Sequence, residues 1–228
     1  MSDARARAWQ AAGRAAAALV PDGGRVGLGT GRAAAAGIHA LAERMGAGLR
    51  CVGVATSRAS AELAAGLGIP LDDMRGPVDL AFDGADVVTP EGLVVKGAGG
   101  ALVRERIVDD TARRFVVLVD AAKLAPSADA WGVLPVAVLP FATAFVAGAL
   151  ADLAPVARPA PTDDGLTLLD VRPPAGADWE ALHARIRALP GVVDTGLFRV
   201  SPADVLVGAP DGGVATLAGR HAGDRRAP

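Results

Sequence analysis

Four ionisable side chains lie close together in the middle of the sequence, and they could carry acid–base chemistry. Asp83 and Asp86 belong to the run Asp-Gly-Ala-Asp, and Lys96 opens the run Lys-Gly-Ala-Gly-Gly, which Glu105 follows. Carboxylates can give and take protons, and an ammonium can stabilise a developing oxyanion. Because a lone Asp-Gly pair is an ordinary turn signal, the prediction of an active site depends on the combination.

The surrounding elements explain how these side chains could meet. Residues 78–82 and 93–95 are apolar runs typical of strands, and they lead into the first aspartate and the lysine. The spacing after the glycines predicts a helix over 101–108 that carries the glutamate in its first turn. Open α/β sheets bind ligands at the carboxyl ends of their strands, and a helix start offers free N–H groups to an anion. We therefore expect a site for a polar, anionic small molecule.

The pattern of the whole chain predicts two parts. Helices are expected over 4–19, 33–45 and 57–67, and strands near 25, 50, 80, 94 and 116, with another opening at 70–71. This order indicates an α/β fold with a mainly parallel, Rossmann-like sheet and helices on both faces. From residue 134 the order strand, helix, strand, helix, strand (136–139, 141–150, 167–171, 179–189, 192–200) indicates a smaller inserted α+β, ferredoxin-like domain on an antiparallel sheet.

The predicted domains are residues 1–133 with 203–228, and residues 134–202. This division follows because 203–208 is typical of a buried strand that returns to the main sheet. The charged tail from Arg220 onward is expected to fray.

Composition excludes several classes of protein. The 228 residues carry a formal net charge of −2, which argues against a nucleic-acid binder. Cys51 is the single cysteine, so no internal disulfide can form, and its apolar surroundings indicate core packing. The three histidines show no ligand-like spacing, so we expect no metal site. Neither a secretory signal nor a run long enough to span a membrane is present, which predicts a cytoplasmic protein.

Several segments together resemble the type A ribose-5-phosphate isomerase family. These segments are Val-Gly-Leu-Gly-Thr-Gly (26–31), Phe-Asp-Gly-Ala-Asp (82–86), 96–105, 114–120 with Lys123, 134–136 with 140–141, 190–193 with 196–198, and 203–205 with 208–212. They follow the order of the family and span nearly the whole chain. The resemblance implies an aldose–ketose isomerase that interconverts ribose 5-phosphate and ribulose 5-phosphate through a cis-enediolate.

The resemblance also implies a role for each site residue. Glu105 is the base that moves the proton, Asp83 and Asp86 bind sugar hydroxyls and assist ring opening, and Lys96 stabilises the oxyanion with N–H groups of the glycine loop. The implied substrate-binding residues are Gly29, Thr30, Gly31, Arg32, Ala33, Gly84, Ala85, Gly97, Ala98, Gly99 and Lys123. No cofactor or metal is implied, because these groups suffice for enolisation, and the expected assembly is a homodimer or homotetramer.

The glycine loop at 27–31 follows a strand and opens a helix, which is the geometry that cradles a phosphate. Its third glycine is misplaced for a dinucleotide fingerprint, and no acidic residue ends the next strand, so NAD is not expected. The family usually continues this loop with Ser-Thr, whereas this chain has Arg32 and Ala33. Either Arg32 replaces the lost hydroxyls as a phosphate ligand or the substrate differs.

Three other positions depart from the family pattern. Trp9 stands where the family often presents a lysine, and Val87 and Ala137 stand where it prefers glutamate. Other readings therefore stay open. The chain could act on another sugar or sugar phosphate, it could be an inactive sugar-phosphate sensor, or it could be a coenzyme A transferase-like enzyme with a glutamate nucleophile. A sugar-phosphate sensor would need a DNA-binding module. An assay with a thioester would distinguish a coenzyme A transferase-like enzyme from an isomerase.

Overall fold

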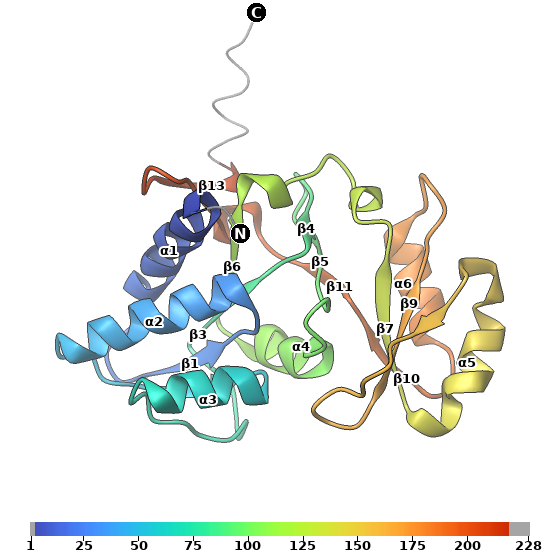
Figure 1. Ribbon diagram of the computed structural model, residues 1–228, viewed down its shortest axis with the longest axis horizontal. Coiled ribbons are helices and arrows are strands. Elements are labelled where there is room, and N and C mark those ends of the chain that lie inside the picture. Colours follow the sequence, from blue (N-terminus) through green and yellow to red (C-terminus); the bar gives the residue numbers. More distant parts are fainter. Residues whose placement is uncertain (1–2, 219–228) are drawn as a thin grey trace, which may run out of the picture.

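The computed structural model describes residues 3–218, and a six-stranded sheet forms its larger part (Figure 1). The strands lie in the order β13-β12-β6-β3-β1-β2. Their bounds are β1 Gly24–Leu28, β2 Cys51–Ala55, β3 Leu80–Gly84, β6 Phe115–Asp120, β12 Val205–Gly208 and β13 Val214–Thr216. Only β13 pairs antiparallel; every other neighbouring pair is parallel. The predicted α/β class and the return of the chain to the main sheet at β12 are confirmed.

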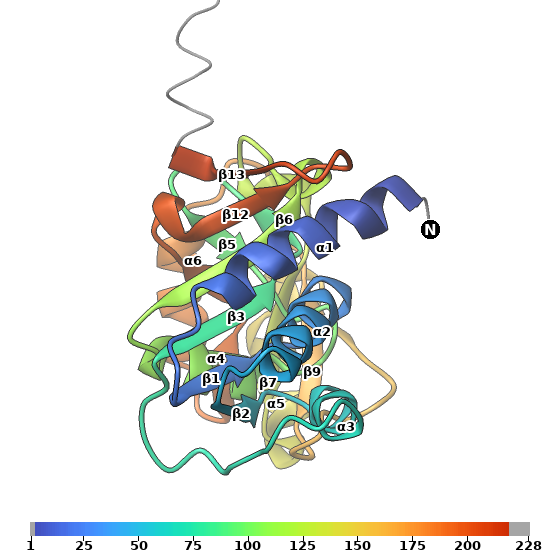
Figure 2. The same cartoon turned by 90° about the vertical axis from the view of Figure 1, so that its left-hand side faces the viewer.

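Helices cover both faces of this sheet, as predicted. They are α1 Asp3–Ala18, α2 Arg32–Gly46, α3 Arg58–Gly66 and α4 Leu102–Thr111. Neighbouring residues of β3 point to opposite faces: Phe82 packs in the core cluster of Trp9 and Ile38 from α1 and α2, whereas Ala81 packs with Val108 of α4. Figure 2 shows α1 lying across β6 and β12.

The smaller part is built on a second, antiparallel sheet, with the order β10-β7-β9-β8 (Figure 1, right). Its elements are β7 Leu134–Val138, α5 Thr143–Ala149, β8 Val156–Ala157, β9 Thr167–Val171, α6 Trp179–Arg187 and β10 Val192–Thr195. This βαββαβ order is the ferredoxin-like one, which confirms the predicted class. The sequence analysis missed β8 because two exposed residues are too few to show the alternating pattern of a strand.

Residues 93–95 form a strand, as predicted, but this strand does not belong to the main sheet. They form β5 Leu93–Val95, which belongs to a third, three-stranded sheet with β4 Val87–Val88 and β11 Leu197–Arg199 and pairs antiparallel with both. Only four residues separate β4 from β5, and so short a connection forces a hairpin, because a parallel neighbour needs a crossover of a dozen or more residues. The small sheet packs Val94 and Phe198 against Val117 and Val119, so it covers part of the second face of the main sheet.

The single strand predicted over 192–200 is in fact two strands in two sheets. Gly196 separates β10 from β11; its N–H donates to Pro135 O at 2.7 Å, and its carbonyl accepts the Lys96 N–H at 2.9 Å. A Cβ at Gly196 would lie 2.2 Å from Lys96 O, so only glycine allows this approach. The strand predicted to open at 70–71 is reduced to one bridge between Leu71 and Gly53.

The proposed division at residues 134 and 202 stays a prediction. Its small domain would include β11, which pairs with β5 outside it. The fraying predicted from Arg220 lies outside the described residues. Within residues 3–218 no helix has the length and apolar character needed to cross a membrane.

Candidate active site

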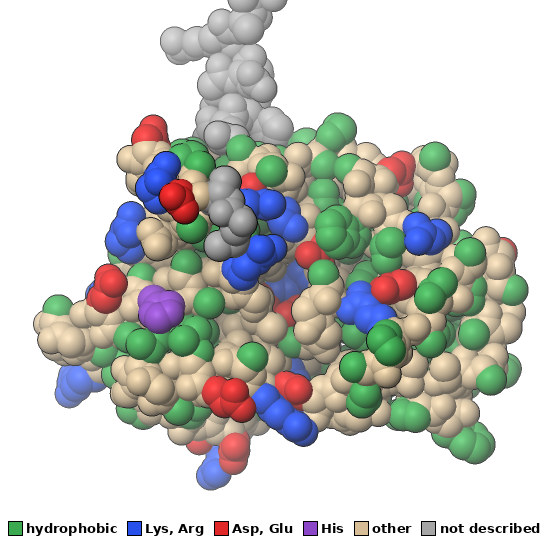
Figure 3. Space-filling view, viewed as in Figure 1, with side chains coloured by type: hydrophobic (Ala, Val, Ile, Leu, Met, Phe, Trp, Pro, Cys, Tyr) green, Lys and Arg blue, Asp and Glu red, His purple; other side chains and the backbone are tan. Residues whose placement is uncertain are grey.

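A pocket of about 260 Å³ lies where the sheet edge, the start of α2 and the glycine loop before α4 meet. Figure 3 shows acidic and basic side chains gathered around a hollow between the two parts of the molecule. The lining residues are Trp9, Thr30, Gly31, Arg32, Ala33, Gly84, Ala85, Asp86, Lys96, Gly97, Ala98, Gly99, Glu105, Leu118 and Lys123. Every predicted site residue except Asp83 and Gly29 therefore lines one pocket, and those two lie directly behind it.

Lys96 is the centre of a buried charge cluster at the base of this pocket. Its Nζ forms an ion pair with Asp83 and lies 3.6 Å from Glu105 Oε2 and 3.4 Å from Asp109 Oδ2. All four side chains are at most 5% exposed. Three carboxylates from β3 and α4 thus surround one ammonium that is shielded from solvent.

Burial controls the protonation of these groups. It raises the pKa of Glu105 to about 8; Lys96 opposes this rise, and the neighbouring carboxylates of Asp83, Asp109 and Asp86 add to it. Burial raises the pKa of Asp109 to about 8 in the same way. Burial alone would lower the pKa of Lys96, but its carboxylate neighbours outweigh that effect and hold the pKa above its usual range. Lys96 therefore stays an ammonium while Glu105 can exchange a proton near neutral pH.

Asp83 holds Lys96 and the glycine loop at residues 27–31 in place. One of its oxygens accepts the N–H groups of Thr30 at 3.0 Å and Gly84 at 2.6 Å, and the other accepts from Lys96. A Cβ at Gly29 would lie 2.3 Å from the Asp83 carboxyl group, so only glycine at this position allows the loop to lie so close to Asp83. Burial raises the pKa of Asp83, and the lysine opposes that rise. The predicted contact of Asp83 with sugar hydroxyls stays a prediction.

Asp86 and Lys123 form the opposite wall of the pocket. Asp86 Oδ2 accepts the N–H of Ala98 at 3.0 Å, and its Oδ1 lies 3.9 Å from Lys123 Nζ. The Lys123 side chain is 20% exposed, and its Nζ lies 5.2 Å from the centre of the Trp131 ring. Lys123 is therefore a pocket residue.

A cation and an indole meet at the rim of the pocket. The guanidinium carbon of Arg32, at the start of α2, lies 4.9 Å from the centre of the Trp9 ring. The indole N–H of Trp9 donates to Asp120 Oδ2 at 2.9 Å, and Arg5 Nε donates to the same oxygen at 2.8 Å. Asp120 therefore fixes the ring that packs against Arg32. The sequence analysis did not predict this group, because Asp120 follows Trp9 by 111 positions and Arg5 by 115.

Asp109 is the second residue that sequence reasoning missed. It lies four positions after Glu105, and positions four apart share one face of a helix, so a signal was present. It was missed because the helix predicted over 101–108 ended one position before it, whereas α4 continues to Thr111. Neither of its oxygens has a hydrogen-bond partner among the described residues.

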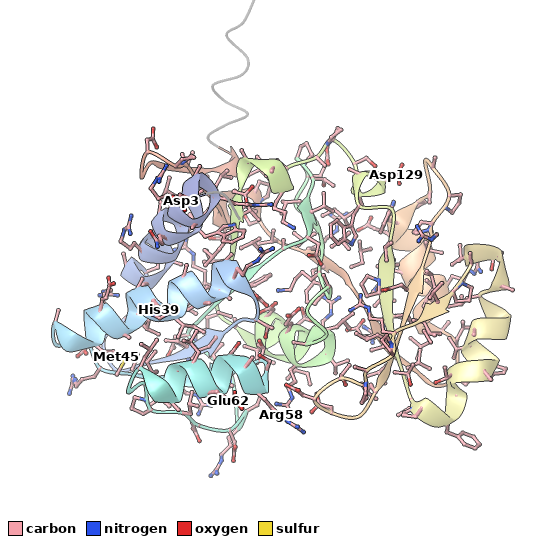
Figure 4. All side chains as sticks on the ribbon, in the orientation of Figure 1. Asp3, His39, Met45, Arg58, Glu62 and Asp129 are labelled. Atoms are coloured by element: carbon pink, nitrogen blue, oxygen red, sulfur yellow. The ribbon has the colours of Figure 1, made fainter. Side chains whose placement is uncertain are left out.

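The structure gives no sign of a metal centre. Among residues 3–218 no group of three or more His, Cys, Asp or Glu side chains has an arrangement that could hold an ion. His39 lies along α2 away from the pocket, where Figure 4 labels it, and His183 bonds Thr195 in the smaller part. Cys51 is buried in the core, as predicted.

These features are those of an α/β enzyme suited to acid–base chemistry on a small anionic molecule, because a buried carboxyl group lies beside an ammonium at the base of a pocket. Residues 52–212 match the family model for ribose 5-phosphate isomerase A (phosphoriboisomerase A). Ribose-5-phosphate isomerase A from Thermomicrobium roseum is 44% identical over 217 residues, which cover 90% of this chain and 92% of the relative. The chain belongs to the ribose 5-phosphate isomerase A family.

Solved structures agree with this assignment. Ribose 5-phosphate isomerase A from Methanocaldococcus jannaschii superposes with a TM-score of 0.84 at 38% identity, covering 91% of this chain and 96% of that one. A ribose-5-phosphate isomerase in complex with phospho-erythronic acid gives a TM-score of 0.85 at 30% identity, covering 94% and 98% of the two chains.

Proposed function

We propose that this protein interconverts ribose 5-phosphate and ribulose 5-phosphate, a step of the non-oxidative pentose phosphate pathway. The observation that carries this proposal is the meeting of Glu105 and Lys96 at the base of one pocket that Arg32 and Lys123 also line. A sugar phosphate has matching ends: a carbonyl that must be enolised and an anion that must be held.

The proton moves through Glu105. Its carboxylate takes the proton from C2 of the open-chain aldose, and the electron pair moves toward O1 to form the cis-enediolate. The hydroxyl proton of O2 passes to O1, and the same carboxyl group returns its proton to C1, which leaves a carbonyl at C2 and gives the ketose. A pKa of about 8 suits this role, because a base with a pKa near the working pH can both accept and release the proton.

Lys96 stabilises the negative charge that develops on the oxygen. Its ammonium stays protonated and is held by Asp83 and Asp109 from behind, so it needs no reorganisation when the charge forms. The glycine loop supplies further donors. Two of its N–H groups are used inside the protein, from Ala98 to Asp86 and from Gly100 to Gly97 O, which assigns the oxyanion contact to Gly97 and Gly99.

Asp86 binds sugar hydroxyls and assists ring opening, because it is the carboxylate that faces the pocket beside the loop. Arg32 and Lys123, which line the same pocket, hold the phosphate together with the N–H groups of the loop at Thr30 and Gly31. A guanidinium is a planar fork donor suited to phosphate, so Arg32 can replace the hydroxyls of the usual Ser-Thr pair.

A direct assay tests the function. Purified protein is given ribose 5-phosphate, free ribose, and a four-carbon and a six-carbon sugar phosphate, and the ketose formed is measured. We expect ribose 5-phosphate to be the best substrate. Faster turnover of another phosphate would assign a different sugar, and no turnover of any of them would refute the isomerase.

We also propose a homodimer or homotetramer in the cytoplasm. The smaller part exposes Leu139, Phe141 and Phe145, and Phe141 is fully exposed, which supports association between copies. The free thiol of Cys51 fits a reducing compartment. Light scattering after size-exclusion chromatography tests the assembly, and a monomer at micromolar concentration would contradict it.

A further inference from the structure

Arg158 extends from the smaller part of the molecule to the catalytic glycine loop. It directly follows β8, and its guanidinium forms a two-point ion pair with Asp170 of β9, at 2.9 and 2.7 Å. Its Nη1 also donates to the carbonyl of Gly97 at 2.7 Å and to that of Ala98 at 3.2 Å. The Arg158 side chain is 21% exposed, so these bonds are partly shielded from water.

The two sides of one peptide group connect Arg158 to Asp86. The carbonyl of Gly97 and the N–H of Ala98 belong to the same planar unit, and in a trans peptide they point in opposite directions. The carbonyl accepts from Arg158, and the N–H donates to Asp86 Oδ2 at 3.0 Å. Because the unit is rigid, the cation on one side determines where the carboxylate is held on the other.

We propose that Arg158 is a positioning residue for Asp86, acting through the peptide group between Gly97 and Ala98. Gly97 has a φ of 105°, a region that is readily open only to glycine, so nothing in its own side chain holds this peptide in one orientation. The charge-assisted bond from Arg158 does so, and it also polarises the peptide, which strengthens the N–H as a donor. The proposal rests on the proposed isomerase function.

The same contact gives the smaller part a catalytic task. The next peptide carries the Ala98 carbonyl, which Arg158 also binds, and the N–H of Gly99, which lines the pocket. Holding that carbonyl toward Arg158 turns the Gly99 N–H away from the smaller part. An arginine is needed because its planar fork can bind Asp170 and the loop carbonyls together, whereas a lysine presents a single point charge.

A double-mutant cycle tests whether Arg158 acts through Asp86. Arg158→Ala, Asp86→Ala and the double variant are compared with the wild type in kcat and KM for ribose 5-phosphate, after thermal unfolding has confirmed that each is folded. We expect Arg158→Ala to lower kcat roughly 10- to 100-fold with little change in KM, because a small misplacement of a catalytic group costs that much. When Asp86 is already alanine, we expect the additional change Arg158→Ala to lower kcat less than about threefold.

Arg104→Ala is the matched control. Arg104 also joins the two parts by a two-point ion pair, with Asp164 at 2.9 and 2.6 Å, but it does not bind the glycine loop. We expect this variant to keep kcat within about twofold of the wild type. If it loses as much activity as Arg158→Ala, the effect is one of docking between the two parts and the proposal is wrong.

Other outcomes are equally decisive. Equal losses from Arg158→Ala with and without Asp86, or an unchanged kcat in Arg158→Ala, would overturn the positioning role. If Arg158→Ala does not fold, Arg158→Lys takes its place in the same cycle, with an intermediate loss expected. A wild type that does not isomerise ribose 5-phosphate would instead refute the proposed function.

Discussion

Replacing Glu105 by glutamine should abolish turnover and at the same time stabilise the protein at neutral pH. Glutamine keeps the size of the side chain but cannot accept a proton, so we expect kcat to fall roughly 10²- to 10⁴-fold. The gain in stability follows from burial. The Glu105 side chain is 5% exposed, and its site favours the neutral acid, whereas the unfolded chain ionises this group freely at neutral pH.

The size of the stability effect follows from the pKa. Folding raises the pKa of Glu105 from 4.5 to about 8, so the unfolded chain releases this proton at a lower pH than the folded one. The contribution of Glu105 to the free energy of unfolding is therefore unaffected well below pH 4.5 and falls steadily as the pH rises toward 8. Between pH 5 and 8 the loss amounts to about 3 kcal/mol, at 1.36 kcal/mol per pH unit.

Urea unfolding of the wild type and of Glu105→Gln at pH 5 and pH 8 measures this difference. We expect the two proteins to be similar at pH 5 and the variant to be more stable at pH 8. Glu62→Gln, on the exposed face of α3 (Figure 4), is the control and should change neither stability nor turnover. If the free energy of unfolding depends on pH in the same way for the wild type and for Glu105→Gln, then folding does not raise the pKa of Glu105. Wild-type turnover in the variant would exclude Glu105 as the base.

Three further changes test the rest of the site. Asp109→Asn removes a carboxylate that raises the pKa of Glu105, so the acidic limb of the profile of kcat/KM against pH should move to lower pH. An unchanged limb would show that Asp109 does not influence the pKa of the base. Arg32→Ala should raise KM for ribose 5-phosphate about 10- to 100-fold, the value of a charge-assisted bond, and Arg32→Ser with Ala33→Thr should recover much of it. Free ribose should respond little to either change, and an unchanged KM would remove Arg32 from the phosphate site. EDTA should not inhibit; activity lost to the chelator and restored by a divalent ion would contradict the metal-free mechanism.

Much of this site could be predicted from local sequence. Strand-like runs end at Asp83 and at Lys96, and a helix begins shortly before Glu105. The rules for strand ends and helix starts therefore predicted that these residues lie in one site. The glycine at position 29 and the loop around it were found in the same way. Each of these signals involves neighbours along the chain, where backbone geometry and side-chain period act directly.

Contacts between distant segments depended on the tertiary structure. The sequence placed β5 in the main sheet, but a short hairpin and pairing with β11 put it in another one. Trp9 meets Asp120, and Arg158 meets the Gly97 carbonyl, across long stretches of chain. Such pairs are selected by how distant elements pack together, because a guanidinium or an indole can donate to many acceptors and the local sequence does not specify which one. Burial likewise depends on the whole fold, and it is burial that raises the pKa of the Glu105 carboxyl group to about 8.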